Sequence, residues 1–178
     1  MDFWSWAFSD FRSNALRGVF AEYLVALALD AAEGTRVEWD AYDVSGPKGL
    51  RIEVKCAAYL QSWAQRGPSK LVFSGLSARK WTTESGFADV RTANADVYVF
   101  AIQTCTDHDR YDATDVDQWE FHVLPGNVIA ELGTRSISHA TLLRTSIGPV
   151  PWTGIAAAIA GAHADSGPSG HRKGERDV

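Results

Sequence analysis

Two acids and a lysine fall where a β-hairpin would gather them. Residues 39–43 (Trp-Asp-Ala-Tyr-Asp) precede a turn with one proline and two glycines, which is followed by Leu-Arg-Ile-Glu-Val-Lys-Cys at 50–56. Runs that contain β-branched and aromatic residues, on either side of a turn with proline and glycine, predict a β-hairpin. Because side chains alternate between the two faces of a strand, Glu53 and Lys55 lie on the same face. Asp43 lies on that face too in any hairpin in which the numbers of two paired residues add up to an even number. Direct pairing of Asp43 with Glu53 leaves residues 46–50 as the loop, and a slip of two residues leaves the acids roughly 7–8 Å apart.

Two converging carboxylates repel unless a proton or a cation lies between them. A few oxygen ligands with room for water suit Mg²⁺ or Mn²⁺ better than Zn²⁺. Lys55 could then orient or polarise a water and balance the charge on a phosphate, which is the chemistry of metal-assisted phosphodiester hydrolysis. The alternative is that Asp43 and Glu53 are solvated on an exposed face, where Lys55 simply pairs with Glu53.

A helix is predicted just before the hairpin, from about Ser13 to Asp30. Its apolar positions follow helical spacing. The expected core stripe is Leu16, Val19, Phe20, Tyr23, Leu24 and Leu27. Glu22 is the only charge between Arg17 and Asp30, and small residues flank it one turn away on each side. A carboxylate is costly to bury unpaired, so Glu22 is expected at a rim or in a site. The alternative is a simple exposed glutamate.

These residues resemble the PD-(D/E)xK, restriction-endonuclease-like nuclease superfamily. The similarity consists of an acid-bearing first helix, the hairpin acid followed by Ile-Glu-Val-Lys, a third strand at Lys70 to Ser74, and a later helix. It covers roughly Asn14 to Val123 and is strongest from Arg36 to Gln61. Residues 91–100 also look like the fourth strand of uncharacterised bacterial members.

The resemblance implies an α/β fold in which helices flank a mixed central β-sheet. It implies metal ligands at Asp43 and Glu53, a further metal contact from the Val54 carbonyl, and Mg²⁺ or Mn²⁺ as the ion. One departure is that Tyr42, rather than proline, precedes Asp43. The catalytic residues implied by the resemblance are Asp43, Glu53, Lys55 as the catalytic lysine, Glu22 and Gln61.

The segment from Leu50 to Trp81 is basic although the whole chain has a net charge of −5. Its cations alternate with aromatic residues, a mixture suited to phosphate contacts and base stacking. The expected nucleic-acid contacts are Arg51, Arg66, Lys70, Arg79 and Lys80. The interleaved aromatics are Tyr59, Trp63, Phe73 and Trp81. The alternative is that these aromatics belong to the core and the charges scatter over several faces.

Length and composition predict one domain, residues 1–162, followed by a disordered tail, residues 163–178. The 178-residue chain is 46% hydrophobic, enough for one sizeable core. Neither a membrane span nor a signal peptide is indicated, and the two cysteines read as buried thiols in a reducing compartment, so we expect a cytoplasmic protein. The aromatic residues between 3 and 11 either pack on the core or form a self-association surface, which would permit a homodimer.

The rest of the chain reads as scaffold. Residues 96–104 and 118–124 are expected to extend the sheet, and 107–120 to form an acidic loop between them. A short helix is expected from Val128 to Leu132, and a core-docking helix from Trp152 to Ala162. The five histidines show no paired ligand spacing, and His122 is expected to be a strand residue with a local partner rather than a base.

These patterns together predict a metal-dependent nuclease. DNA is favoured over RNA as the partner only through the family resemblance. One alternative is a nuclease-fold module that binds nucleic acid or assembles with it but has lost catalysis. Another is an α/β protein with a different acid–lysine chemistry.

Overall fold

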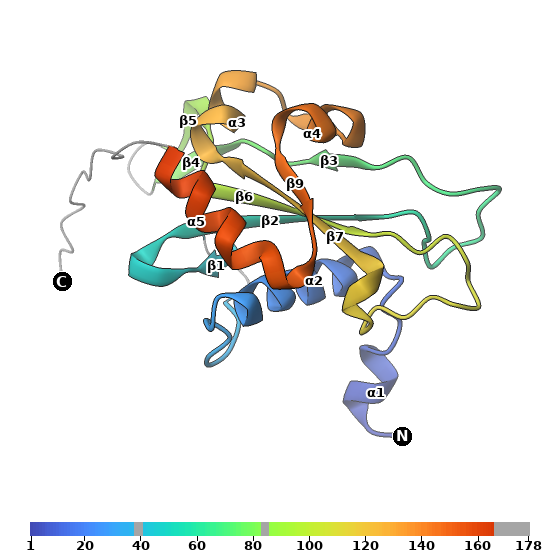
Figure 1. Ribbon diagram of the computed structural model, residues 1–178. Helices are drawn as coiled ribbons and strands as arrows, with labels where there is room; N and C mark the ends of the chain where they lie inside the picture. The colour runs from blue at the N-terminus through green and yellow to red at the C-terminus, as the bar shows by residue number, and fades with distance from the viewer. Residues whose placement is uncertain (38–40, 83–85, 166–178) are drawn as a thin grey trace.

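The computed structural model describes residues 1–37, 41–82 and 86–165, with the backbone alone at 78–82 and 86–92. The protein has an α/β fold around a five-stranded mixed sheet, as the sequence predicted (Figure 1). β2 and β6 are parallel, and the other neighbouring strands are antiparallel. In spatial order the strands are β1 (Val44–Ser45), β2 (Arg51–Ala58), β6 (Val97–Gln103), β7 (Trp119–Pro125) and β9 (Ile147–Val150).

Helices cover both faces of this sheet. One face packs against α2 (Asn14–Ala28) and α5 (Ile155–Asp165), whose buried residues join those of the strands in one core cluster. The opposite face carries a second cluster under α3 (Gly126–Leu132), α4 (His139–Thr145) and a small sheet. The small sheet pairs β3 (Val72–Ser74) with β8 (Ser136–Ser138). All seven residues of β6 are buried, as expected for a strand covered on both sides.

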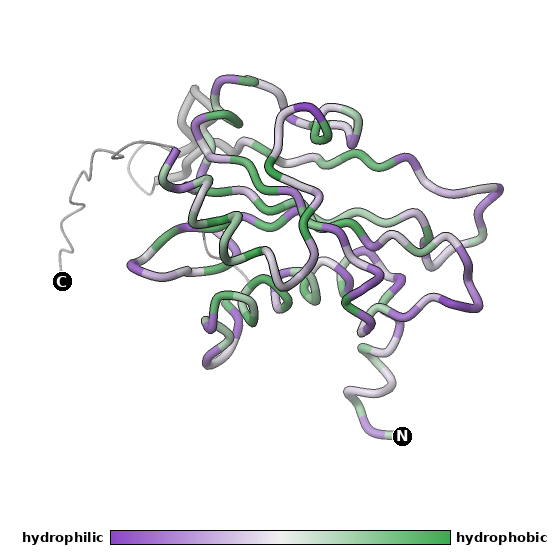
Figure 2. Tube along the Cα trace, in the orientation of Figure 1, coloured by the Kyte–Doolittle hydropathy of each residue, from purple (hydrophilic) through white to green (hydrophobic). Residues whose placement is uncertain are grey.

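The predicted sheet strands at 96–104 and 118–124 are confirmed as β6 and β7. The loop between them is largely exposed, and Figure 2 shows it as mostly hydrophilic. The two predicted short helices are confirmed as α3 and α5. The expected inner face of α5 is buried, because small and β-branched residues let the helix lie close to the sheet. The buried residues of α5 are Ile155, Ala158, Ile159 and Ala162.

The predicted helix before the hairpin is confirmed as α2, but its predicted core stripe is right only in part: Leu24 is buried and Phe20 packs against the core. The side chains of Val19, Tyr23 and Leu27 are exposed. The buried residues of α2 are Arg17, Ala21, Leu24 and Val25. Ala21 is fully buried in the core cluster that α2 shares with β2. The helix therefore presents a smaller set of residues to the sheet and leaves its larger side chains along a groove.

The hairpin has the direct register, one of the two that the sequence allowed. Val44 pairs with Ile52 and Ser45 with Arg51, so Asp43 falls opposite Glu53. The turn contains a short 3-10 helix, Pro47–Gly49, in which Lys48 and Gly49 both have positive φ. The first strand is shorter than expected: β1 begins at Val44, and residues 38–40 lie outside the described part of the chain.

Two other strand expectations need correction. Residues 70–74 do contain a strand, β3, but it pairs with β8 instead of entering the main sheet. The expected strand at 91–100 is divided: its first two residues end β5 (Gly86–Thr92), which forms a hairpin with β4 (Ala78–Thr82), and β6 begins only at Val97.

The ends of the chain differ in how they are held. At the N-terminus, α1 (Phe3–Ala7) exposes its aromatic rings, whereas Phe11 packs against the core. The expected tail begins within α5, which continues to Asp165, and residues 166–178 lie outside the described chain. Across the described residues, no helix combines the length and apolar character that crossing a membrane requires.

Candidate active site

The hairpin holds Asp43 against the backbone of β2. One carboxylate oxygen, Oδ2, accepts the N–H of Val54 at 2.7 Å. The N–H and C=O of a strand residue point to the same side of the strand, so the Val54 carbonyl is also directed toward Asp43. Among the described residues, no hydrogen bond reaches Oδ1 of Asp43. A carboxylate oxygen and a backbone carbonyl thus lie close together, and both are ligand types that Mg²⁺ accepts.

Glu53 and Lys55 lie side by side on one face of β2. The Lys55 ammonium donates to Glu53 Oε1 at 2.5 Å, and the two side chains are only 22% and 16% exposed. Lys55 also passes beside Gly75, where a Cβ would lie 3.8 Å from its Nζ. The bond to Glu53 uses one of the three N–H groups of the ammonium. The geometry therefore leaves Lys55 able to donate to a water or a phosphate oxygen as well.

The pKa of Glu53 shows which charges surround it. Burial raises this pKa above its ordinary value, the charge of Lys55 opposes the rise, and the negative charges of Asp43 and Glu22 add to it. Asp43, Glu53 and Lys55 are thus brought together as predicted in geometry, with Glu22 within electrostatic reach. Asp43 and Glu53 beside one ammonium offer oxygen ligands that fit a divalent cation, while the charge of Glu22 is offset by its partner Arg36.

Glu22 stands at the rim of a groove and is paired. Its carboxylate accepts two hydrogen bonds from the Arg36 guanidinium, one of them at 3.0 Å, and its side chain is 13% exposed. The groove has a volume of about 490 Å³ and runs between α2, the segment that follows it, and the start of the hairpin. Glu22, Arg36 and Asp43 all line it. The acid of α2 therefore belongs to the same hollow as the acid of the hairpin.

Gln61 lies beyond the other end of β2. It is buried, its Oε1 accepts from Arg17 at 3.2 Å, and its Nε2 donates to the Ala58 carbonyl at 3.0 Å. These bonds anchor the start of α2 to the segment after β2. The structure gives Gln61 this anchoring position rather than a place beside the carboxylates, so its predicted catalytic role has no geometric support.

The expected nucleic-acid contacts differ in availability. Arg51 is bound to Asp96, with its Nε 3.1 Å from Oδ2 and its Nη2 2.6 Å from Oδ1. Arg66 and Lys70 are exposed in the loop between β2 and β3. The side chains of Arg79 and Lys80 lie outside the described part of the structure, so nothing follows for them.

The aromatics interleaved with these cations are mostly packing residues. Phe73 is 2% exposed and Tyr59 packs against the same core cluster, whereas Trp63 is 55% exposed. The side chain of Trp81 is not among those described. The alternative that the aromatics belong to the core therefore holds for Phe73 and Tyr59, and Trp63 is the stacking candidate that the structure leaves accessible.

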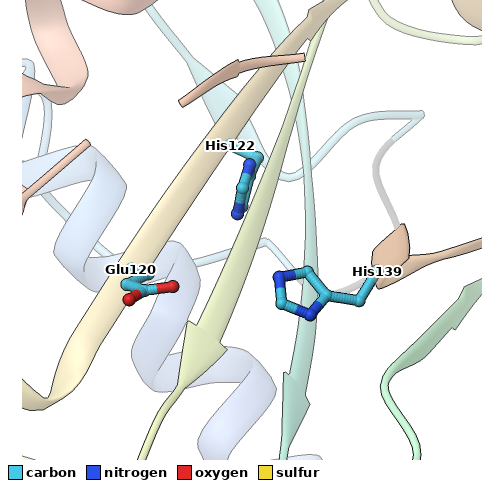
Figure 3. A group of neighbouring side chains, drawn as sticks. All are labelled: Glu120, His122 and His139. Atoms are coloured by element: carbon cyan, nitrogen blue, oxygen red, sulfur yellow. The ribbon is translucent and has the colours of Figure 1, made fainter. Parts of the chain in front are cut away.

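A second group of polar side chains was missed at the level of sequence. Glu120 and His122 lie two residues apart on one face of β7, and His139 is the first residue of α4 (Figure 3). One ligand atom from each of the three residues lies within 4.8 Å of the other two. Burial, helped by the nearby His139, lowers the pKa of His122 to about 4. The expected local partner of His122 exists, since its Nδ1 lies 2.9 Å from Ser146 Oγ. Sixteen residues without a recognisable spacing separate the two histidines, so only the fold reveals the group.

The fold and site define an α/β protein in which two carboxylates and a lysine lie close together at one hairpin, and one of the carboxylates, Asp43, also lines a groove. Residues 7–114 match the family model described as bacteriophage T4 endonuclease IV. This match covers more than half of the chain, so the protein belongs to the bacteriophage T4 endonuclease IV family. Membership supports a nuclease, a hydrolase that acts on the phosphodiester bonds of nucleic acid. A comparison with curated proteins found no match.

Proposed function

We propose that the protein is a metal-dependent nuclease of the PD-(D/E)xK type that cleaves DNA. Asp43, Glu53 and the carbonyl of Val54 would hold one Mg²⁺ or Mn²⁺ ion. Such an ion polarises the phosphoryl group and lowers the pKa of a bound water. The observation that carries the proposal is that Asp43, Glu53 and Lys55 lie close together. Lys55 bonds to Glu53, whose side chain is 16% exposed, and burial together with the negative charge of Asp43 raises the pKa of Glu53.

The protein's own side chains would divide the remaining work. Lys55, already oriented by Glu53, would donate to the attacking water or to a phosphate oxygen. Glu22 would position Arg36 at the groove and add negative charge near the cation. Arg66 and Lys70 would contact phosphates away from the proposed metal site, since both are exposed. DNA rather than RNA rests on the family resemblance of the sequence alone.

Cleavage assays with two charge-removing variants test the proposal. Supercoiled, linear and single-stranded DNA, and RNA, are incubated with Mg²⁺ or Mn²⁺. Asp43→Asn keeps an oxygen that can accept from Val54 N–H, and Lys55→Met keeps the length of the stem, so both should fold. We expect each variant to lose cleavage by at least about 100-fold, the scale of removing one donor from a transition state.

Lys48→Met is the matched control, because Lys48 is an exposed lysine in the turn of the same hairpin. It should cleave like the unmodified protein. Wild-type activity retained in Asp43→Asn and Lys55→Met would refute the proposed site. Nucleic-acid binding without cleavage, in the presence of either ion, would instead support the alternative that the protein is a catalytically inactive binding module.

We further propose that the protein forms a homodimer through α1, because cutting both DNA strands is simplest with two sites. Phe3, Trp4 and Phe8 form a cluster of rings with centroids 5.2–6.0 Å apart, and Trp6 is 76% exposed. Sedimentation equilibrium should show a dimer that Trp4→Ser/Trp6→Ser converts to a monomer. A wild-type protein that stays monomeric at every accessible concentration would rule this out, without bearing on the cleavage site.

A further inference from the structure

The group formed by Glu120, His122 and His139 has the composition of a transition-metal site. It offers two imidazole nitrogens and one carboxylate oxygen from two separate elements, β7 and α4. Figure 3 shows the three side chains pointing toward a common space. Imidazole ligands suit Zn²⁺ and similar borderline ions, whereas Mg²⁺ prefers oxygen alone. The group therefore differs in chemistry from the oxygen-only set of Asp43 and Glu53.

Hydrogen bonding fixes which nitrogen of His122 faces this space. The Ser146 hydroxyl donates its single hydrogen to the Leu142 carbonyl at 2.7 Å. Its oxygen must then accept from His122 Nδ1, which lies 2.9 Å away. The proton is thus on Nδ1, and Nε2 carries the lone pair. Metal-binding histidines commonly donate their other ring N–H in this way, which orients the ring.

Two buried nitrogens of the group have no hydrogen-bond partner. Within the described part of the chain, Nε2 of His122 and Nε2 of His139 are both buried and unpaired, and His122 is 0% exposed. A buried polar atom without a partner costs on the order of 1–3 kcal/mol. The two rings meet edge to face with centroids 5.6 Å apart. A metal ion between them would satisfy both nitrogens at once.

The group is separate from the proposed nuclease site although both lie on one face of the sheet. Lys55 pairs with Phe100 and Phe100 pairs with His122, so the three residues form one row across β2, β6 and β7. Two strand spacings place Lys55 and His122 roughly 10 Å apart. Phe100 is 0% exposed, and Phe73 packs against it with ring centroids 5.1 Å apart. Packed aromatic rings thus divide the two sites.

We propose that Glu120, His122 and His139 bind one Zn²⁺-class divalent ion that ties α4 to β7. The ion would bridge a central region of the sheet and a helix of only seven residues, and so would stabilise the fold. Bonds of about 2.1 Å require the donor atoms to be no more than about 4 Å apart, so binding would draw them together slightly. Glu120 and His139 are only partly buried, which allows this adjustment and leaves an open position for water.

Metal titrations of the full chain without a histidine tag test this proposal. After chelator treatment, Zn²⁺ and Co²⁺ are added while the affinity, the visible spectrum of Co²⁺ and the melting temperature are followed. We expect one equivalent to bind, Co²⁺ to give the spectrum of a nitrogen- and oxygen-ligated ion, and the Tm to rise by about 5–10 °C at a hundredfold excess over Kd. Mg²⁺, which we propose binds the carboxylates of the separate nuclease site, should not displace Zn²⁺ or Co²⁺ from this group.

Three variants localise the ion. His139→Gln and Glu120→Gln replace partly exposed ligands and should keep the fold, as circular dichroism would verify, while weakening Zn²⁺ binding by at least about 10-fold. His163→Gln, at an exposed position of α5, should leave the affinity unchanged. Failure to bind one equivalent, or equal affinity in the folded His139→Gln and Glu120→Gln proteins, would overturn the proposal. Because the readouts do not involve DNA cleavage, this outcome is independent of the nuclease assay.

Discussion

At the scale of single residues, ion pairs decide which predicted cations are available for nucleic acid. Arg51 was expected to contact phosphates, but Asp96 binds its guanidinium and also accepts its backbone N–H at 3.0 Å. Hydrogen bonds from Arg51 hold the pKa of Asp96 below its ordinary value. The pair joins the start of β2 to the residue before β6. Its first role is therefore to hold two strands together.

Replacing Asp96 should make stability depend on pH in a defined direction. A carboxylate with a lowered pKa in the folded state stabilises the protein above its unfolded pKa, and the effect disappears as pH falls through the folded pKa. Asp96→Asn should thus lower the free energy of unfolding by about 1 kcal/mol at pH 7, a modest value because solvent screens the half-exposed Arg51. The difference from wild type should shrink as pH falls below about 4, measured by urea denaturation.

Asp109→Asn is the control for this experiment, since Asp109 is exposed in the loop between β6 and β7. It should leave stability unchanged across the same pH range. If Asp96→Asn and Asp109→Asn had equal effects at pH 7, the Arg51–Asp96 pair would have no structural role.

At the scale of elements, local pattern predicted the hairpin well because its turn residues and side-chain parity act within a few residues. Parity alone placed Asp43 on the side of Glu53, while the choice between direct pairing and a slip of two residues came from the structure. The buried face of α2 followed only in part, because Arg17, Ala21 and Val25 are buried beside the predicted Leu24. Nor could pattern indicate that Gln61 would bond to buried Arg17, since that contact spans 44 positions of sequence. Interactions between distant segments escape periodicity.

The same reason explains the missed histidine group. His139 starts α4, which follows α3 and β8 in the chain before it packs back near β7. No spacing in the sequence encodes this contact between α4 and β7. By contrast, Glu120 and His122 are two residues apart in a predicted strand and were recognisable as facing one way. An acid and a histidine two residues apart on one face of a strand that is expected to be buried are therefore the only part of the group that the sequence could have indicated.

A glycine at the start of α3 should be needed for the packing of that helix against the sheet. A Cβ at Gly126 would lie 2.2 Å from the Ala95 carbonyl oxygen, and the Gly126 N–H already donates to the Asp96 carbonyl at 2.7 Å. Gly126→Ala should therefore cost at least about 2 kcal/mol, because backbone must move to relieve the contact. Thermal and urea unfolding measure this loss.

Gly161→Ala is a matched substitution with the opposite expected sign. Gly161 lies in α5, and a Cβ there meets nothing within 4 Å. Alanine should raise the free energy of unfolding by about 0.5–1 kcal/mol through helix propensity. Destabilisation of similar size in both variants would show that the approach of Gly126 to Ala95 is not the cause.

At the scale of the whole molecule, the net charge of the protein should oppose nucleic-acid binding at the proposed site until a cation is present there. The chain carries a net charge of −5, and its proposed site holds Asp43 and Glu53 beside Lys55, with Glu22 paired to Arg36. Phosphates approaching this site therefore meet more negative than positive charge. A divalent ion there would reverse the sign of the local field. Affinity for nucleic acid and catalysis would then both require the bound ion.

Removing divalent ions should therefore weaken DNA binding. In fluorescence anisotropy at fixed ionic strength, a labelled duplex should bind at least about 10-fold more tightly in Ca²⁺, an oxygen-binding cation, than in EDTA. Asp43→Asn should lose most of that gain, whereas Lys48→Met should keep it. Equal affinity with and without Ca²⁺ would place the binding surface away from the carboxylates.

The five-residue connection between the paired strands, residues 46–50, restricts how this hairpin can vary in length. Adding or deleting one residue there would turn Asp43 to the sheet face opposite Glu53, while a change of two residues would keep them on the same side. Functional versions of this hairpin should thus tolerate insertions only in even steps. The test is a library of hairpin loops that are lengthened or shortened by odd and by even numbers of residues. Selection for cleavage should recover only the loops changed by an even number.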